Sequence, residues 1–328
     1  MSHRKDTDYL AVSARIRAME NRLLTRERMD RMIEAKDTAE ARKVLSECGY
    51  PDDQTMPLEQ VLAQARGETL ADLTRAVPEP ALVEIFGLKY DYHNAKVLVK
   101  AQAMEAAPER LMQSGGRYTP EMLLTGWRQE SLRGCSSVFT AAVAQAQELL
   151  KQTKDPQQAD LLLDRACYEE MAMLAKSLES KFLMGYVRLC VDVANLRTAV
   201  RVARMGKEND FLRQVLLKGG NVSEQAILSA GPEGLSEVFQ SGVLAQAAQL
   251  GTQLVRAGGS LTAFEKVCDD ALTSYLAQAR RIPFGEEVVI GYVYAKELEI
   301  TAIRTIFAGR AAGLDAETIR ARLRESYA

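Results

Sequence analysis

The sequence predicts an all-α protein that repeats one helical unit. Ala, Leu, Glu, Arg and Gln are its commonest residues, and these residue types lose little free energy on entering a helix. Only 6 % of the 328 residues are aromatic and only 9 are proline, and there is hardly any strand-like alternation. A short acid–amide–base pattern also recurs three times, at intervals of 101 and 107 residues. We therefore expect three related helical lobes.

The chain opens with three predicted helices. Residues 9–35 carry apolar side chains near helical spacing, with Arg and Glu between them, and predict one long amphipathic helix. Residues 38–48 predict a second helix, ended by Gly49 and Pro51. Residues 58–76 predict a third, closed by Pro78 and Pro80.

Each copy of the repeated pattern lies in a predicted helix, within residues 86–107, 185–204 and 291–309. An acid is followed three places on by an amide or small residue, and five places on by a base. The residues are Asp91, Asn94 and Lys96; Asp192, Asn195 and Arg197; and Glu299, Ala302 and Arg304. We call these three helices the motif helices.

A glycine break and a newly capped helix follow each motif helix. Gly115-Gly116 and Gly219-Gly220 predict helix ends, because glycine is common at helix C-termini. A helix-capping side chain comes next in each copy, with an acidic residue in the following turn. These predicted caps are Thr119, Ser223 and Asp315.

A helical wheel places an apolar stripe along each motif helix, with an acidic edge on one side and a basic edge on the other. In the second copy the stripe is Leu189, Val193, Leu196 and Val200. One hypothesis is that the acidic edge of one lobe faces the basic edge of its neighbour, which would set their register. The alternative is a solvated charged rim of little energetic weight.

The repeat predicts three lobes, residues 1–107, 108–206 and 207–328, in one compact unit. This division allows the first and last helices to pack together. A period of about 100 residues is too long for the common short helical repeats.

No known catalytic pattern is visible. The sequence has no phosphate-binding P-loop and no dinucleotide-binding glycine motif. His93 and the five scattered cysteines are expected to be structural, and Trp127 to pack in a core. We therefore expect no catalytic, cofactor-binding or metal-binding residues. The net charge of −2 argues against nucleic-acid binding, and no apolar run predicts a membrane span or signal peptide.

The same residues resemble a known family. The three motif copies, the opening residues 9–20 and the closing residues 291–327 are similar to the C subunit of the archaeal and bacterial V/A-type ATPase, whose counterpart in the eukaryotic V-ATPase is the d subunit. The resemblance covers essentially the whole chain, and residues 291–327 are its most specific part. Ala302 departs from the pattern, since the third copy lacks the amide.

The resemblance implies an all-α, pseudo-threefold funnel without a catalytic site. It implies a central-stalk component on the cytoplasmic side of a membrane, a socket between the D and F subunits of the central axle and the proteolipid ring, serving ATP-linked proton or sodium transport. Thr119, Ser223 and Asp315 would then lie in partner-contact loops, or in ordinary surface loops. Two alternatives are an unrelated helical scaffold or adaptor and an all-helical enzyme.

Overall fold

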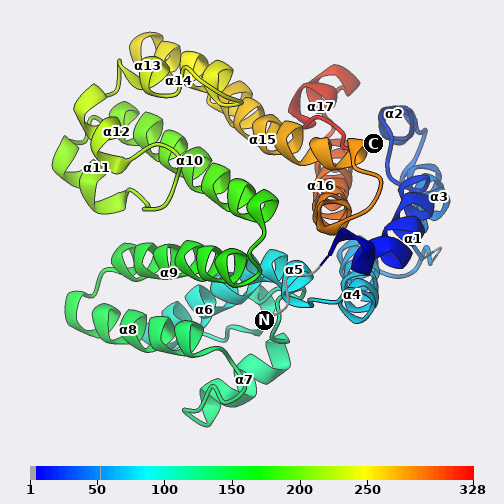
Figure 1. The fold of residues 1–328 in the computed structure, drawn as a ribbon, viewed down its shortest axis with the longest axis horizontal. Coiled ribbons are helices and arrows are strands. Elements are labelled where there is room, and N and C mark those ends of the chain that lie inside the picture. Colours follow the sequence, from blue (N-terminus) through cyan, green and yellow to red (C-terminus); the bar gives the residue numbers. More distant parts are fainter. Residues whose placement is uncertain (1–4, 52) are drawn as a thin grey trace.

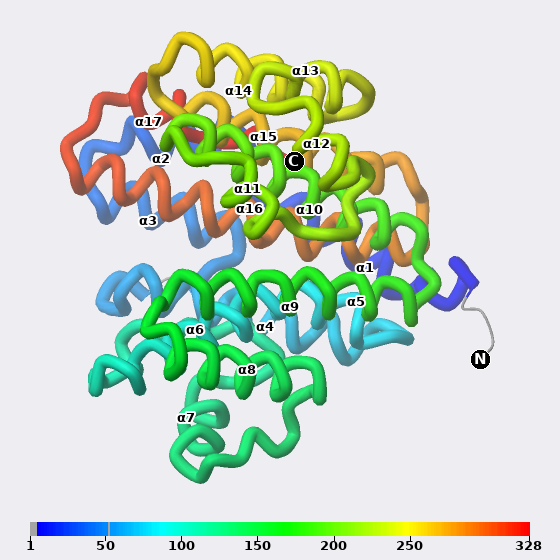
Figure 2. The backbone as a smooth tube through the Cα atoms, turned by 90° about the vertical axis from the view of Figure 1, so that its left-hand side faces the viewer, coloured from blue at the N-terminus to red at the C-terminus, as the bar shows by residue number. Residues whose placement is uncertain are grey.

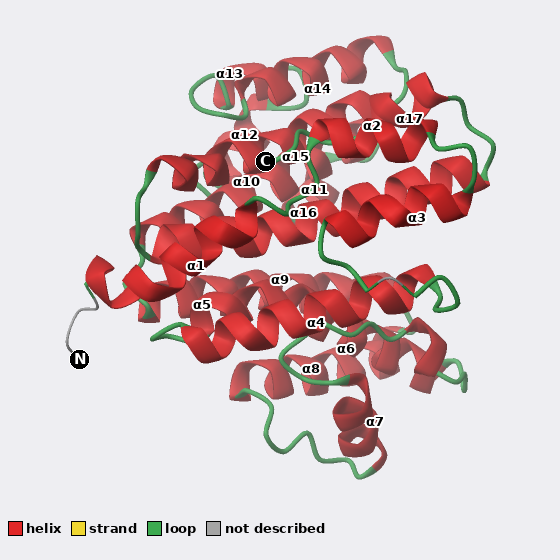
Figure 3. Cartoon of the chain, turned by 90° about the vertical axis from the view of Figure 1, so that its right-hand side faces the viewer, coloured by secondary structure: helices red, strands yellow, loops and turns green. Residues whose placement is uncertain are grey.

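The computed structural model describes residues 5–51 and 53–328. Helices joined by turns and loops account for these residues, which contain no strand (Figure 3). The predicted all-α class is confirmed. None of the helices in the described ranges is long and apolar enough to cross a membrane.

The α-helices differ greatly in length, and short 3-10 helices (η) separate some of them. In chain order the elements are η1 (Asp6–Tyr9), α1 (Leu10–Glu20), α2 (Arg26–Glu34), α3 (Thr38–Glu47), α4 (Leu58–Ala76), α5 (Ala81–Glu84), η2 (Ile85–Gly87), α6 (Leu88–Ala103), η3 (Glu109–Leu111), α7 (Pro120–Arg128), α8 (Ser137–Thr153), α9 (Pro156–Ser177), α10 (Lys181–Arg204), α11 (Asn209–Val215), α12 (Glu224–Ala230), α13 (Leu235–Val238), α14 (Ala245–Ala257), α15 (Thr262–Leu276), η4 (Ala277–Arg281), α16 (Glu286–Ala311) and α17 (Ala316–Arg322).

The prediction of one helix over residues 9–35 is wrong, because α1 ends at Glu20 and α2 begins at Arg26. The Thr25 side chain caps α2 by accepting a hydrogen bond from the backbone N of Arg28. In the break, the backbone N of Leu24 donates to the carboxylate of Glu299 at 2.6 Å. A tertiary contact therefore competes with helix continuation. In the sequence itself, Thr25 followed by Glu27 indicates a helix start, because threonine is a common N-cap and an acid favours the first turn.

The other early helices and the motif helices follow the predictions closely. The helix predicted at 38–48 is α3, and the helix predicted at 58–76 is α4. The motif helices are α6, α10 and α16. The apolar stripe Leu189, Val193, Leu196 and Val200 is buried along α10, as the helical wheel indicates.

Three apolar cores hold these helices together. The central core joins α1 and α4–α9 to the first halves of α10 and α16. A second core lies within residues 189–271, between the second half of α10 and α11–α15. The third core combines residues 24–65 with residues 300–323, so both ends of the chain contribute to it.

The helices form three groups in Figure 1. One contains α10–α15, which we call the arm. Another contains α6–α9, and the third contains α1–α4 with α16 and α17, which we call the terminal body. Seen from the side in Figure 2, α8 and α9 lie below α16, while α13 and α14 lie above it. The pseudo-threefold symmetry and the three lobe boundaries stay predictions.

Candidate functional site

The acids of the first two motif helices hold the loop that follows each helix. Asp91 Oδ1 accepts a hydrogen bond from the backbone N of Tyr118 at 3.3 Å. Asp192 accepts hydrogen bonds from the backbone N atoms of Asn221 and Val222, both at 3.1 Å. Both aspartates are almost fully buried. Each carboxylate thus replaces the water that these backbone groups lose on folding.

The amides make the same contact in both copies. Asn94 exchanges two hydrogen bonds of 2.8 Å with the backbone of Gln113, one from its Nδ2 and one to its Oδ1. Asn195 does the same with Leu217, again at 2.8 Å for both bonds. An amide suits this position because it donates and accepts at once, which neither a carboxylate nor an alkyl group can do.

The second glycine of each pair lies against one of these carboxylates, and the pairs do not end helices as predicted. A Cβ on Gly116 would lie 2.1 Å from Asp91 Oδ1, and one on Gly220 would lie 2.2 Å from Asp192 Oδ1. The motif helices end earlier, at Ala103 and Arg204. Glycine therefore allows the backbone of the loop to approach the buried acid.

The bases connect each motif helix to another helix. Lys96 Nζ lies 2.6 Å from Asp164 of α9, and Arg197 Nη2 lies 2.7 Å from Asp269 of α15.

In the third copy Arg304 Nη2 lies 2.6 Å from Glu59 of α4. The hypothesis that the acidic edge of one lobe faces the basic edge of its neighbour is wrong for the motif acids, because Asp91 and Asp192 bind loops. Each motif base does pair with an acid of a neighbouring predicted lobe, on α9, α15 or α4. The rim is not simply solvated either, since Asp91 and Asp192 are buried.

The third acid holds the N-terminal part of the chain. Glu299 is buried and accepts hydrogen bonds of 2.6 Å from the backbone N of Leu24 and from the Tyr50 hydroxyl. The ammonium group of Lys296 also pairs with this carboxylate. Lys296, one turn before the buried Ile300 of α16, thus offsets a buried charge.

Burial has the largest influence on the pKa of Asp91 and of Asp192. It raises the pKa of Asp91 to about 6, although the guanidinium of Arg117 at 2.8 Å opposes this shift. Burial also raises the pKa of Asp192, against the hydrogen bonds from Val222 and Asn221. Asp91 is thus ionised at neutral pH with little margin.

One cavity of about 260 Å³, which we call the central cavity, is lined by residues of all three motif helices. Its wall contains Lys89 at the start of α6, Tyr186 of α10 and Glu297 of α16. Lys89 Nζ lies 2.7 Å from Glu297 Oε2. Burial alone would raise the pKa of Glu297, but Lys89 and the Tyr90 hydroxyl outweigh it and lower that pKa. The remaining lining residues are Ile85, Phe86, Met171, Asp269, Leu272, Tyr294, Leu298, Thr301 and Arg324.

This cavity offers a binding surface of mixed polarity. Its charged side chains pair with one another, as Lys89 does with Glu297. The described residues hold no group of three or more His, Cys, Asp or Glu side chains placed to bind a metal ion. The arrangement can accept polar and apolar side chains of another molecule.

Residues 12–322 match the family described as ATP synthase (C/AC39) subunit. The chain belongs to this family. The resemblance seen in the sequence is thereby confirmed, and the alternative of a scaffold unrelated to rotary ATPases is excluded.

Three relatives that are named as C subunits match between 72 % and 98 % of the chain. The C subunit of the V-type sodium ATPase of Enterococcus hirae is 22 % identical over 98 % of this chain and 99 % of its own length. The C subunit of the V-type ATP synthase of Thermus thermophilus is 25 % identical, over 91 % of this chain and 93 % of its own length. The C subunit of the A-type ATP synthase of Haloferax volcanii is 27 % identical, over 72 % and 71 %.

In this member of the ATP synthase (C/AC39) subunit family, the three predicted caps are confirmed as caps. Thr119 accepts a hydrogen bond from the N of Met122 in α7, and Ser223 from the N of Ala226 in α12, both at 3.2 Å. Asp315 caps α17. All three are exposed, and their role in partner contact stays a prediction.

The structure also places the other residues that the sequence singles out. His93 Nε2 donates to the carbonyl oxygen of Leu111 at 3.0 Å. Trp127 packs against the central core, as predicted. The five cysteines are free, and Cys48, Cys167 and Cys268 are buried.

Sequence reasoning missed Arg117, which bridges Asp91 and Glu170 at 2.8 Å to each. Arg117 directly follows Gly115-Gly116, and this glycine pair is the local feature that marks its position in the sequence. Asp164 and Asp269, the partners of the bases, were also missed. They lie 105 residues apart, near the spacing of the repeat, so the repeat itself could have shown them.

Proposed function

We propose that the chain is a non-catalytic central-stalk component of a V/A-type rotary ATPase. It acts as a socket that couples the D and F subunits of the central axle to the membrane proteolipid ring, on the cytoplasmic side of the membrane, in ATP-linked proton or sodium transport. The observation that carries this proposal is the central cavity, to which all three motif helices contribute lining residues.

The way the cavity wall is held supports a socket. Buried acids attach the following loop to α6 and α10 and the N-terminal segment to α16. The bases attach the same helices to α9, α15 and α4. Packed helices with few interior breaks resist deformation, which a part that transmits torque requires.

The names of the relatives support the choice of complex. One belongs to a V-type sodium ATPase, and others belong to V-type or A-type ATP synthases.

The lining of the cavity supports a binding role without turnover. A nucleophile needs a neighbouring base, and a general acid or base needs a free, suitably tuned carboxyl or imidazole group. Glu297 is instead paired with Lys89 and Tyr90, which lower its pKa.

Binding of the purified D–F axle complex to the full chain tests the proposal. Thr301→Trp places a large side chain at the cavity, and we expect it to weaken D–F binding at least tenfold. Thr153→Trp is the matched control, because both threonines are exposed and donate to the carbonyl oxygen four residues earlier in their helix. We expect the control to bind D–F normally. Failure of the unaltered chain to bind D–F would contradict the proposal.

The capped loops at Thr119, Ser223 and Asp315 are our proposed partner contacts. Photo-crosslinking residues placed at each position, in the assembled complex, should give adducts with D, F or the ring. The exposed position Thr153 serves as the control. Adducts that are no more frequent at the three caps than at Thr153 would show ordinary surface loops.

A further inference from the structure

The C-terminal segment, residues 323–328, connects the terminal body to the arm. It follows α17 as non-helical chain. Both of its anchors lie outside the arm: Leu323 is buried in the third core, and Tyr327 is buried in the central core against Gly291 of α16. Ser326 Oγ also donates to the carbonyl oxygen of Leu24 at 3.3 Å.

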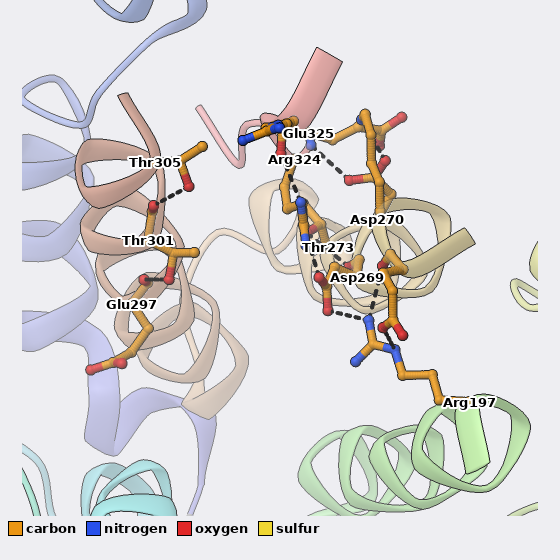
Figure 4. Close-up of polar contacts among 12 residues, drawn as sticks. Arg197, Asp269, Asp270, Thr273, Glu297, Thr301, Thr305, Arg324 and Glu325 are labelled. Atoms are coloured by element: carbon orange, nitrogen blue, oxygen red, sulfur yellow. Dashed lines mark hydrogen bonds and ion pairs between the residues drawn. The ribbon is translucent and has the colours of Figure 1, made fainter. Parts of the chain in front are cut away.

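The middle of this segment binds α15 of the arm. Arg324 Nε donates to Asp269 Oδ2 at 2.8 Å, and the backbone N of Glu325 donates to Asp270 Oδ1 at 2.7 Å. Figure 4 shows these contacts on the side of α15, with Thr301 and Glu297 of α16 opposite them. The contacts with α15 can therefore break while both anchors stay in place.

The contact between Arg324 and Asp269 lies at the wall of the central cavity. The helices α15 and α16 are consecutive, and residues 277–285 join them. Thr273 Oγ1 and Tyr294 Oη, 3.1 Å apart, connect the two helices near this junction. Asp269 lies one turn before Thr273 in α15, and it lines the cavity together with Arg324. The segment thus closes the cavity where α15 and α16 diverge.

The C-terminal segment is held weakly against both α15 and α16. The side chains of Arg324 and Asp269 are 26 % and 28 % exposed, and partly exposed ion pairs contribute little and weaken with salt. Against α16, a small cavity of about 60 Å³ separates the segment from Thr301 and Thr305. The hydroxyls of these threonines donate to carbonyl oxygens of their own helix.

Asp269 also stays positioned without the segment. Its Oδ1 accepts a hydrogen bond from Arg197 of α10 at 2.7 Å. Arg324 of the C-terminal segment and Arg197 of the arm thus bind the same carboxylate. Release of Arg324 leaves Asp269 paired within the arm, which lowers the cost of opening.

We propose that Arg324 and Glu325 form a latch that holds the arm against α16, and that its release widens the central cavity. The latch is a property of the chain itself. Its purpose, the admission and retention of the axle, rests on the proposed function.

The distance between the arm and the terminal body tests the latch in the isolated full chain. Spin labels on non-canonical residues at Ser229 of α12 and Ser46 of α3, both exposed, report this distance without interference from the native cysteines. We expect Arg324→Gln to lengthen and broaden the distance distribution, and Arg324→Glu, which repels Asp269, to do so further. Raising the salt concentration should move the unaltered chain the same way.

Arg322→Gln is the matched control. Arg322 is exposed, lies two residues away and pairs with no carboxylate in the described chain, yet its loss changes the net charge equally. We expect its distances to match those of the unaltered chain. Identical distributions for Arg324→Glu and Arg322→Gln would overturn the latch. Because no axle is present, this result is independent of the D–F binding test of the proposed function.

Discussion

At the scale of single residues, the repeated motif is a device for holding loops. Asp91 and Asp192 each bind the backbone of a loop, and a glycine lies directly beneath each carboxylate. The spacing of acid and amide reflects this task, since residues three apart lie on one side of a helix and reach the same loop. Three predictions concern these contacts.

The first prediction concerns the glycine beneath Asp91. Gly116→Ala places a Cβ 2.1 Å from Asp91 Oδ1, so the loop or the acid must shift. We expect a loss of about 1–3 kcal/mol in the free energy of unfolding, measured with urea.

Gly67→Ala is its control, since Gly67 lies within α4 and a Cβ there meets no atom within 4 Å. Alanine at this position should stabilise the chain by about 0.5–1 kcal/mol. Similar effects of the two substitutions would contradict the role of close approach.

The second prediction concerns the amide of the second copy. Asn195→Asp keeps an acceptor for the Leu217 N but turns a carboxylate oxygen toward the Leu217 carbonyl oxygen. We expect a loss of about 1–3 kcal/mol in unfolding free energy at neutral pH. The exposed Asn209→Asp, at the start of α11, should change stability by less than about 0.5 kcal/mol. Equal effects would show that the paired hydrogen bonds contribute nothing.

The third prediction concerns pH. Burial raises the pKa of Asp91 to about 6, while in the unfolded chain it is about 4. Between these values the native state holds a proton that the unfolded chain has lost, so stability falls as the pH rises through this range. The unaltered chain should therefore lose stability relative to Asp91→Asn between about pH 4 and pH 6, in urea unfolding at several pH values. A difference that does not change with pH would contradict the raised pKa.

At the scale of elements, the bases and one broken helix determine how the motif helices are connected. Arg197 attaches α10 to α15 through Asp269 and Glu265. The break between α1 and α2 lets the N of Leu24 reach Glu299 of α16. In both cases a contact between segments that are far apart in the sequence decides how the helices are connected.

The fourth prediction compares two arginines one turn apart on α10. The Arg197 side chain is 21 % exposed and binds two acids of α15, whereas that of Arg201 is 56 % exposed. We expect Arg197→Gln to cost about 1–3 kcal/mol in thermal or urea unfolding. Arg201→Gln should cost less than about 1 kcal/mol. The reverse order would mean that burial does not decide the strength of these pairs.

At the scale of the whole molecule, the chain ends build one core together. Residues 24–65 pack with residues 300–323, so the first and last segments depend on each other. The C-terminal segment then continues to the arm and forms the proposed latch. The terminal body is thus assembled by contacts far apart in sequence, next to the cavity that the proposed function uses.

The fifth prediction follows from this shared core. The double substitution Ile319→Ala and Leu323→Ala removes two side chains that are buried in the third core and leaves Tyr327 of the central core in place. Loss of such side chains costs about 2–5 kcal/mol each. In hydrogen exchange, amides of α2 and α3 should lose protection by at least tenfold. Amides of α8, which packs in the central core, are the internal control and should keep theirs. Equal loss in α8 would contradict a separate third core.

The sequence alone determined the all-α class, the three motif helices, the three helix caps and the family. These depend on helical periodicity, capping side chains and repetition, which are local or recurrent along the chain. Sequence could not show which segments Asp91, Asp192 and Glu299 hold, because each accepts hydrogen bonds from backbone N atoms, and nearly every residue carries such a group.

Only the tertiary structure decided where the helix after Tyr9 breaks, which helix each base reaches and how the C-terminal segment closes the cavity. Each of these depends on contacts between residues distant in sequence, such as Leu24 with Glu299 and Arg324 with Asp269. Such contacts form only when packing buries the apolar stripes and brings the remaining charges into reach of one another.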